Sequence, residues 1–198
     1  MSEIVFATRN TGKKREFALL MKEFDLTISS LDHFNDVPNV VEDGATFKEN
    51  AEKKALEIAK FTNKLTVADD SGLEVWALEN KPGVYSSRFA GDAATDKDNN
   101  KKLLEVMKNI PLARRGASFR CAISIATPEG VVGTVEGSCD GVIGFEEKGF
   151  NGFGYDPLFI RNDYGKTFAE LEDSIKNRIS HRARAFEKAK MIFERILG

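Results

Sequence analysis

Two strand-like segments joined by a very short turn restrict most strongly what this chain can fold into. Phe119–Thr127 and Val131–Gly137 contain many β-branched residues and flank the sequence Pro-Glu-Gly, which predicts a β-hairpin. Elsewhere along the chain, helical apolar periodicity alternates with short apolar runs typical of strands. Such alternation favours an α/β fold, while a hairpin requires antiparallel neighbours in the sheet. The sequence therefore predicts an α/β fold with a mixed, twisted sheet.

The remaining elements follow from periodicity and from the turn residues between them. Further strands are expected at Ile4–Thr8, Leu26–Leu31, Leu65–Asp70, Leu73–Leu78 and Leu158–Ile160. Helices are expected at Thr11–Glu23, with an apolar face that extends to Phe24, and at Gly44–Thr62, Asp96–Asn109 and Ser180–Leu197. No repeat, low-complexity tract or linker interrupts this pattern, so residues 1–198 are expected to form one domain.

Charge and cysteine usage narrow the classes of function. The net charge of −2 gives no overall basic field for binding nucleic acid or an anionic membrane. Cys121 and Cys139 lack metal-binding spacing, so we expect reduced, buried thiols in a cytoplasmic protein. The start of the sequence lacks the apolar core of a signal peptide, and no segment reaches the length that spans a bilayer, so neither export nor membrane anchoring is expected.

A polar, glycine-containing turn lies between the first predicted strand and helix. This segment, TRNTGKK, places free backbone N–H groups at a helix N-terminus and adds Lys13 and Lys14 as counter-charges. It is not a Walker A loop, because the glycine spacing is wrong and no Ser or Thr follows Lys13. Two interpretations stay open: an anion site, or a capped helix start with solvated lysines.

The helix at Gly44–Thr62 carries polar residues beside its apolar face. At about 100° per residue, Asn50 and Lys54 fall within or next to the inward stripe, whereas Lys53 points away. Lys54 either extends its ammonium to the edge of the core or meets an anion. Glu42 precedes the helix, so its carboxylate either interacts favourably with the helix dipole or belongs to a binding site.

Two adjacent carboxylates follow a buried-type apolar run. Asp69 and Asp70 end the run Leu65–Ala68, and a buried charge needs a partner. Side chains alternate along a strand, so the two carboxylates cannot enter one pocket if the strand continues. At the C-terminal tip of a strand, one aspartate would contact a ligand, and with Glu42 it would form a two-carboxylate site suited to Mg²⁺ and phosphates. The alternative is that both aspartates cap the turn that follows.

Two further segments suggest recognition of a flat ring. In GFGYDP, glycines allow close approach to Phe153 and Tyr155, whose rings can stack on a heterocycle, and Asp156 can accept hydrogen bonds from ring N–H groups. The same stretch also fits a turn with core aromatics. After a candidate N-cap at Ser180, His181 and Arg182 can donate to carbonyl oxygens, although His181 also fits a packed surface histidine.

Taken together and in order, these stretches resemble the inosine triphosphate pyrophosphatase family. The matching segments are ATRNTGK, EDGATFKENAEKKA, ADDSGLEV, PGVYSSRFAG, GFGYDPLF and SHRARA, and they span nearly the whole chain. The resemblance implies an elongated mixed sheet flanked by helices, with two lobes around a central cleft, and a homodimer. It also implies Mg²⁺-dependent hydrolysis of ITP, dITP and XTP to the monophosphate and pyrophosphate, which cleanses the nucleotide pool.

The resemblance also assigns roles residue by residue. Asp70 matches the general base, and Glu42 and Asp70 match the metal-linked acids. The phosphate-binding positions are Thr8, Arg9, Asn10, Thr11, Gly12, Lys13, Asn50, Lys54 and Ser71. The base-binding positions are Phe153, Gly154, Tyr155, Asp156, Lys176, His181 and Arg182. Two departures from the family pattern are Arg9, where glycine is frequent, and Phe150-Asn151, where Thr-Gly is common.

Two rival functions remain at this stage. A nucleotide-binding regulator would bind ITP without turnover, and a nucleic-acid-binding protein would show salt-dependent affinity for oligonucleotides. The choice among ITP, dITP and XTP, the phosphorus atom attacked and the element that rejects guanine also stay open.

Overall fold

The computed structural model describes residues 2–23 and 26–197 and divides the chain into two compact units. Unit 1 consists of Met1–Asp70, Cys121–Gly137 and Arg182–Gly198. Unit 2 consists of Ser71–Arg120 and Ser138–His181. Because each unit is built from separate stretches of sequence, both depend on pairing between residues that are far apart along the chain.

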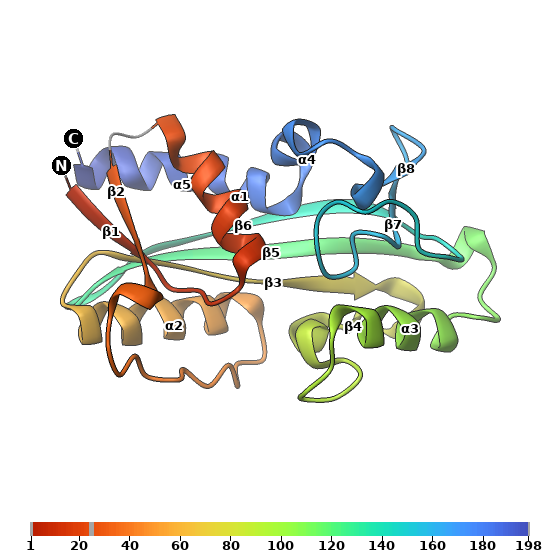
Figure 1. The fold of residues 1–198 in the computed structure, drawn as a ribbon, viewed down its shortest axis with the longest axis horizontal. Coiled ribbons are helices and arrows are strands. Elements are labelled where there is room, and N and C mark those ends of the chain that lie inside the picture. Colours follow the sequence, from red (N-terminus) through yellow and green to blue (C-terminus); the bar gives the residue numbers. More distant parts are fainter. Residues whose placement is uncertain (1, 24–25, 198) are drawn as a thin grey trace. The chain divides into compact units, whose positions relative to one another are not determined.

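The described residues form one mixed set of hydrogen-bonded strands (Figure 1). The strands are β1 (Ser2–Phe6), β2 (Leu26–Ser30), β3 (Thr66–Val75), β4 (Lys81–Pro82), β5 (Gly116–Thr127), β6 (Gly130–Ile143), β7 (Phe159–Arg161) and β8 (Lys166–Thr167). Their order is β2-β1-β3-β5-β6-β7-β8, with β4 paired to β3. β1 is parallel to β2 and β3, whereas β4 is antiparallel to β3 and β7 is antiparallel to β6 and β8. The predicted mixed sheet is confirmed.

Five α-helices accompany these strands in the described part of the chain. They are α1 (Thr11–Leu20), α2 (Phe47–Thr62), α3 (Asp96–Val106), α4 (Asp173–Ile179) and α5 (His181–Leu197). Short 3₁₀ turns lie between them, including η1 (Met21–Glu23) and η4 (Gly83–Arg88). None of the helices within residues 2–23 and 26–197 combines the length and the apolar character needed to cross a bilayer.

Unit 1 is a three-layer arrangement in which helices cover both faces of its strands (Figure 1). Ile4 and Phe6 of β1 belong to the same buried cluster as residues of α1 and α5, and the Phe6 ring stacks on Phe17 with centroids 4.0 Å apart. The intervening residue Val5, followed by Ala7, packs instead with α2. This alternation along β1 separates the face that meets α1 and α5 from the face that meets α2.

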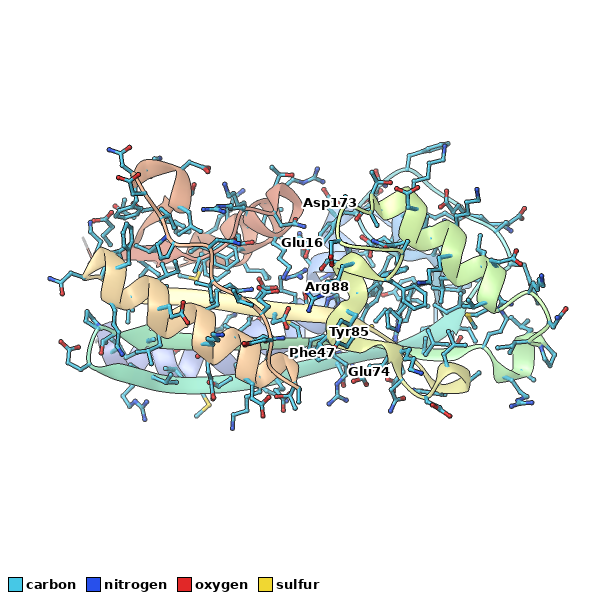
Figure 2. All side chains as sticks on the ribbon, turned by 90° about the horizontal axis from the view of Figure 1, so that it is seen from below. Glu16, Phe47, Glu74, Tyr85, Arg88 and Asp173 are labelled. Atoms are coloured by element: carbon cyan, nitrogen blue, oxygen red, sulfur yellow. The ribbon has the colours of Figure 1, made fainter. Side chains whose placement is uncertain are left out.

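Unit 2 has its own apolar core. The rings of Phe119, Phe159 and Phe168 lie with centroids 4.6 to 5.9 Å apart, and Leu103 of α3 joins the same buried cluster. On η4 the exposed Tyr85 ring receives the guanidinium of Arg88 at 5.0 Å from its centroid, and Figure 2 labels both side chains.

A buried arginine also stabilises unit 2. The Arg115 side chain donates only to backbone carbonyl oxygens among the contacts that the described residues give it. The acceptors are Ile143, Met107, Ile110 and Gly144, at 2.8, 2.8, 3.3 and 2.7 Å. Its burial lowers the pKa of the guanidinium from the ordinary value.

Several predicted boundaries are wrong for identifiable reasons. The two strands expected around Ser71 and Gly72 form the single strand β3, because Leu73 and Val75 are buried on the far side of the expected break. The second helix begins at Phe47 instead of Gly44, since Thr46 accepts from the N–H of Glu49 in a capping box. Helix α4 was not predicted, and Phe24 lies outside the described residues.

Candidate functional site

The turn between β1 and α1 combines a capped helix start with a cation. The Asn10 side chain accepts from the N–H of Lys13 at 3.0 Å, and the Asn10 N–H donates to Thr8 Oγ1 at 3.2 Å. Asn10 is therefore the N-cap of α1, with Thr11 and Gly12 as the first helical residues. Arg9 reaches the carbonyl oxygen of Val37 at 3.3 Å. The capped helix start is confirmed, but the expectation of solvated lysines is wrong, because Lys13 Nζ lies 3.0 Å from Asp69 Oδ2 and Lys14 Nζ lies 2.5 Å from Asp32 Oδ2. Anion binding at this turn stays a prediction.

Asp69 lies at the centre of a buried ionic network in unit 1. One of its oxygens, Oδ2, lies 3.0 Å from Lys13 Nζ and accepts from Nε and Nη2 of Arg182 at 3.2 Å each. Arg182 also pairs with Glu16 of α1, which Figure 2 labels. Burial opposes ionisation of Asp69, but Lys13 and Arg182 outweigh it and hold the pKa of Asp69 well below its usual range.

Asp70 has a different environment, built from α2 and the segment before it. The Asn50 amide donates to Asp70 Oδ2 at 3.0 Å and accepts from the N–H of Gly44 at 2.7 Å. Burial raises the pKa of Asp70, and the charge of Glu42 adds to the rise, against Lys13, Lys54 and the Asn50 hydrogen bond. Asn50 therefore fixes an acid that is harder to ionise than an ordinary aspartate.

Strand geometry explains why Asp69 and Asp70 have different partners on opposite faces of the sheet. β3 continues through both residues, so their side chains point to opposite faces. Asp69 shares the α1 and α5 face with Val67, and Asp70 shares the α2 face with Ala68. The prediction that the two carboxylates cannot enter one pocket holds, although they lie within a long strand and not at its tip.

Lys54 and Glu42 line a pocket in unit 1. Their side chains form an ion pair, and although burial works against its charge, Glu42, Asp69 and Asp70 raise the pKa of Lys54 above its ordinary value. The pocket lining also includes Thr8 and Arg9, together with Ala7, Leu31, Pro38, Asn39, Val40 and Ile58. Lys54 and Asn50 are indeed on the inward side of α2, while Lys53 pairs with the exposed Asp43.

The acids of unit 1 suit a hard divalent cation that brings other ligands. Glu42 and Asp70 are close enough for the charge of one to raise the pKa of the other, a repulsion that a cation would relieve. Within the described ranges, no group of three or more acidic, histidine or cysteine side chains is arranged to hold a metal. A carboxylate pair with the remaining positions filled by phosphate oxygens and water is the arrangement that Mg²⁺ usually has. The residues therefore fit Mg²⁺ bound together with a phosphorylated ligand.

In unit 2, the predicted ring-binding loop is held by an internal ion pair. Lys176 Nζ lies 2.5 Å from Asp156 Oδ2, which also accepts from the N–H of Phe153 at 2.9 Å. The same ammonium lies 4.9 Å from the centroid of the Phe153 ring. Gly152 has a φ of +78°, and a Cβ there would meet Asp156 Oδ2 at 2.0 Å, so only glycine allows this approach. Phe153, Asp156 and Lys176 are thus in contact with one another, while their binding of a base stays a prediction.

The other predicted residues of unit 2 have clear positions. His181 is buried and stacks on Phe119, with ring centroids 4.7 Å apart and an interplanar angle of 12°. The Tyr155 hydroxyl donates to the carbonyl oxygen of Ser86 at 2.8 Å, which makes its ring part of the core. Ser71 is half-buried within β3. Their contact with a ligand stays a prediction.

Sequence reasoning missed Glu16 and the role of Asp69. Glu16 is buried and joins Arg182, which is 166 residues away along the chain. The available signal was its position three residues after Lys13, on one face of α1 and next to the buried Phe17. The partner of Asp69 carried no local signal, since Arg182 is 113 residues away.

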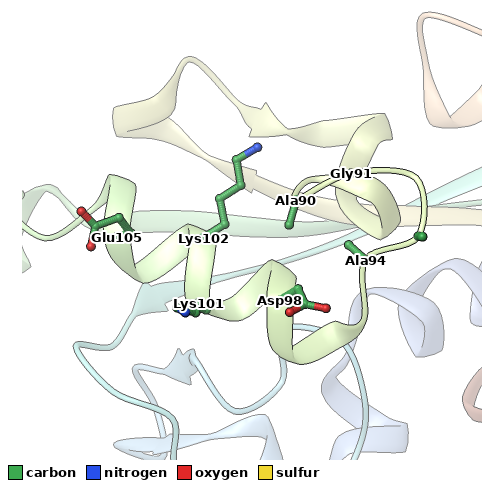
Figure 3. Close-up of a pocket in the computed structure, with 8 residues that line it drawn as sticks. Ala90, Gly91, Ala94, Asp98, Lys101, Lys102 and Glu105 are labelled. Atoms are coloured by element: carbon green, nitrogen blue, oxygen red, sulfur yellow. The ribbon is translucent and has the colours of Figure 1, made fainter.

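A second pocket lies along α3 in unit 2. Its lining consists of Ala90, Gly91, Ala93, Ala94, Asp98, Lys101, Lys102 and Glu105 (Figure 3). It contains none of the predicted site residues, and Lys102 donates to the carbonyl oxygen of Phe89 beside it. Chemistry is therefore better supported at the ionic groups of unit 1.

The fold and these groups define a mixed α/β protein with a buried cationic and acidic site next to a helix N-terminus. The sequence matches the Ham1 family over residues 4–192, and the chain belongs to that family. A protein of Desulforamulus reducens named dITP/XTP pyrophosphatase is 52% identical over 98% of this chain and 96% of its own. Another of that name, from Bacillus cereus, is 48% identical over 95% of this chain and 93% of its own.

Solved structures agree with this assignment. A HAM1 protein from Coxiella burnetii superposes with a TM-score of 0.89 at 39% identity, covering 98% of this chain and all of that one. A nucleoside-triphosphatase, or dITP/XTP pyrophosphatase, from Mycobacterium abscessus gives a TM-score of 0.76 at 41% identity, covering 94% of this chain and 97% of that one.

Proposed function

We propose that this protein hydrolyses the non-canonical purine nucleotides ITP, dITP and XTP to the monophosphate and pyrophosphate, and so removes them from the nucleotide pool. The names of relatives that cover nearly the whole chain support the reaction. The observation that carries the proposal is the group of Lys13, Lys54, Glu42 and Asp70 in unit 1, where two ammonium groups lie among carboxylates.

The triphosphate would be bound by cations and by the start of α1. Lys13 and Lys54 supply positive charge, and the first N–H groups of α1, at Thr11 and Gly12, point out of the helix. Thr8 and Arg9 add a hydroxyl and a guanidinium to the pocket that Lys54 lines. Asn10, Asn50 and Ser71 complete the proposed set, with Asn10 and Asn50 acting through the cap of α1 and through Asp70.

Mg²⁺ is proposed as the cofactor, held by Glu42 and Asp70. When bound, it would neutralise charge that develops on the phosphoryl oxygens. Glu42 is paired with Lys54 in the described residues, so a ligand that occupies Glu42 leaves the Lys54 ammonium available to phosphate. The chain itself thus supplies two acids and two cations around the polyphosphate.

Asp70 is the proposed general base. Burial and Glu42 raise its pKa, and a cation held by Glu42 and Asp70 would oppose that rise and keep the carboxylate ionised, so that it can accept a proton from an attacking water. Asn50 keeps the carboxylate in place by donating to Oδ2 while its own oxygen is fixed by the N–H of Gly44. General-base assistance of this kind contributes about 10²–10⁴-fold to a rate.

Selectivity is proposed to reside in the hydrogen-bond donors assigned to the base. His181 and Arg182 would pair with the 6-keto oxygen of hypoxanthine or xanthine, whereas the 6-amino group of adenine would face unsatisfied donors. Each buried unpaired polar group costs about 1–3 kcal/mol, which amounts to roughly tenfold to hundredfold discrimination. Phe153 and Tyr155 would provide apolar ring surface, and Gly154, Asp156 and Lys176 would shape that side of the base site.

The test is a nucleotide panel with matched variants. Release of pyrophosphate and monophosphate from ITP, dITP, XTP, GTP and ATP is measured with and without Mg²⁺. Asp70→Asn should lower kcat at least a hundredfold, while the melting temperature stays at or above that of the wild type because the buried charge is gone. Asp43→Asn, which changes an exposed acid paired with Lys53, is the control and should stay within about twofold of wild-type kcat.

Three outcomes would count against the proposal. Binding of ITP without release of pyrophosphate would favour a regulator. A kcat above about a tenth of the wild-type value in Asp70→Asn would remove Asp70 as the base. A uniform loss of activity on all nucleotides in His181→Ala would argue against its role in base recognition.

We also propose a cytoplasmic homodimer that binds neither nucleic acid nor membranes. The family resemblance supports the dimer, and the net charge of −2 supports the absence of a nucleic-acid partner. Light scattering of the purified protein should give a mass near twice the 22.0 kDa of one chain, and a monomeric mass would remove this part of the proposal.

A further inference from the structure

Helix α3 holds one peptide group of the 152–156 loop from both sides. The N–H of Gly154 donates to Asp96 Oδ2 at 2.7 Å, and the Gly154 carbonyl oxygen accepts from the Asn100 amide at 3.1 Å. Asp96 and Asn100 are four residues apart, so they lie on the same side of α3. The backbone at Gly154 is thereby fixed in position and in orientation by side chains that belong to another element of unit 2.

The buried side-chain amide of Asn100 makes one hydrogen bond among the described residues, to the Gly154 carbonyl oxygen. Its side chain is almost fully inaccessible, and burying an amide costs free energy unless hydrogen bonds compensate. Its nitrogen serves Gly154, while its oxygen has no hydrogen-bond partner among the described residues. Since packing alone would favour an apolar side chain here, the hydrogen bond to the loop is the compensation that the structure supplies.

The loop needs an external restraint because of its glycines. Gly149, Gly152 and Gly154 have φ values of +83°, +78° and +61°, a region that glycine enters easily and other residues rarely. Glycine also gives the chain its largest conformational freedom, so an unrestrained loop would sample many positions. Phe153 lies directly between two of these glycines, and its position therefore depends on how the Gly154 peptide is held.

The neighbouring amide, Asn99, has a different target. It donates to the carbonyl oxygen of Ser87 at 3.1 Å and accepts from the N–H of Ala90 at 2.8 Å. Asn99 is as buried as Asn100 and lies on the same helix, but it restrains the end of η4 and the segment that follows it instead of the 152–156 loop. The two asparagines therefore form a natural pair for comparison.

We propose that Asp96 and Asn100 are positioning residues for purine recognition, because they hold the Gly154 peptide and so place the Phe153 ring and Asp156 against the base. This inference rests on the proposed function, in which the 152–156 loop contacts a 6-keto purine. Neither residue touches the base; both act through the loop. Loss of either hydrogen bond should weaken discrimination between bases and leave binding of the phosphate tail unchanged.

The first experiment compares two exposed acids in the first turn of α3. Asp96→Ala removes the acceptor of the Gly154 N–H, and we expect the ratio of kcat/KM for ITP to that for ATP to fall about three- to tenfold. Asp98→Ala removes one half of the capping box, in which Asp98 accepts from the N–H of the N-cap residue Thr95 at 2.9 Å, and should leave that ratio within about twofold. Asp96→Asn keeps an acceptor oxygen and should restore most of the ratio.

The second experiment uses the two buried amides. Asn100→Ala should lower the ITP to ATP ratio by a similar factor, and Asn99→Ala should lower thermal stability at least as much with little change in the ratio. Inhibition by inorganic tripolyphosphate, which probes the phosphate contacts alone, should stay within about twofold in all variants. A change confined to the ratio distinguishes positioning of the loop from general loss of structure.

The outcomes separate this inference from the proposed function. If the wild-type chain prefers ITP but Asp96→Ala and Asn100→Ala keep the wild-type ratio, the inference is wrong and the function stands. A ratio that falls equally in the Asp98→Ala and Asn99→Ala controls also overturns it. If the wild-type chain releases pyrophosphate from none of the nucleotides, both proposals fail.

Discussion

Replacing Asp69 with asparagine removes the negative charge that Lys13 and Arg182 share. The Asp69 and Arg182 side chains are 1% and 2% exposed, and Lys13 is 14% exposed. Water therefore has little access to the two cations once they lose the carboxylate. Breaking a buried ion pair by removing one partner costs about 3–5 kcal/mol. Because Arg182 keeps Glu16 as a partner, we expect the lower end, a loss of about 3 kcal/mol in the free energy of unfolding.

Urea unfolding at pH 7, in the presence of a chelator, measures this loss directly. The matched control is Asp43→Asn, in which the acid is 66% exposed and lies 2.7 Å from Lys53. An exposed pair contributes little, so the control should lose less than about 0.5 kcal/mol. A loss below about 1 kcal/mol in Asp69→Asn, or equal losses in the two variants, would refute the assignment of Asp69 as the centre of a buried ionic network.

The pH dependence of stability is a second test of the charge interactions of Asp69. Lys13 and Arg182 hold the pKa of Asp69 below its unfolded value of about 3.9, despite its burial. The unfolded chain then binds a proton before the folded one, so the contribution of Asp69 is present above about pH 4 and is lost as the pH falls below it. The free energy of unfolding should decrease more steeply below pH 4 in the wild type than in Asp69→Asn.

Two further predictions concern the stability contributed by buried groups that the proposed function does not use. Arg115→Lys should lower the free energy of unfolding by about 2 kcal/mol in urea titrations, because one ammonium cannot serve the carbonyl oxygens that the guanidinium reaches; a change under about 0.5 kcal/mol would contradict this. Burial raises the pKa of Cys121 to about 12, whereas the unfolded thiol ionises near pH 8.5, so stability should fall between those values as the pH rises. Cys121→Ala should show a shallower fall between pH 8 and pH 10.5, and identical slopes would exclude the effect.

Local sequence patterns were sufficient to predict features that depend on a single helix, turn or hairpin. The positions of Asn50 and Lys54 on the inward side of α2, and of Lys53 on the outward side, were predicted correctly, because a 3.6-residue period fixes the face of each side chain. The hairpin and the capped start of α1 were likewise set by a few neighbouring residues, here Pro128-Glu129 and Asn10. In each case the physical cause lies within one or two turns of chain.

Other features depended on residues that are distant in sequence. Ser71 and Gly72 look like a strand break, but burial of Leu73 and Val75 in the core of unit 2 keeps β3 continuous. The seven residues of α4 are too few for a clear helical period. Strand alternation alone could not tell Asp69 and Asp70 apart, because their different partners, Arg182 and Asn50, are supplied by different helices; only the family resemblance singled out Asp70.

Because β3 is continuous, the face of the sheet to which each aspartate points depends only on whether its position along the strand is odd or even. Deleting one residue between Thr66 and Asp69 would exchange the faces of the two carboxylates, and the acid meant for Arg182 would meet Asn50 instead. A single substitution within this strand changes the side chain on one face, whereas a shift of a single position would invert the electrostatics on both sides at once.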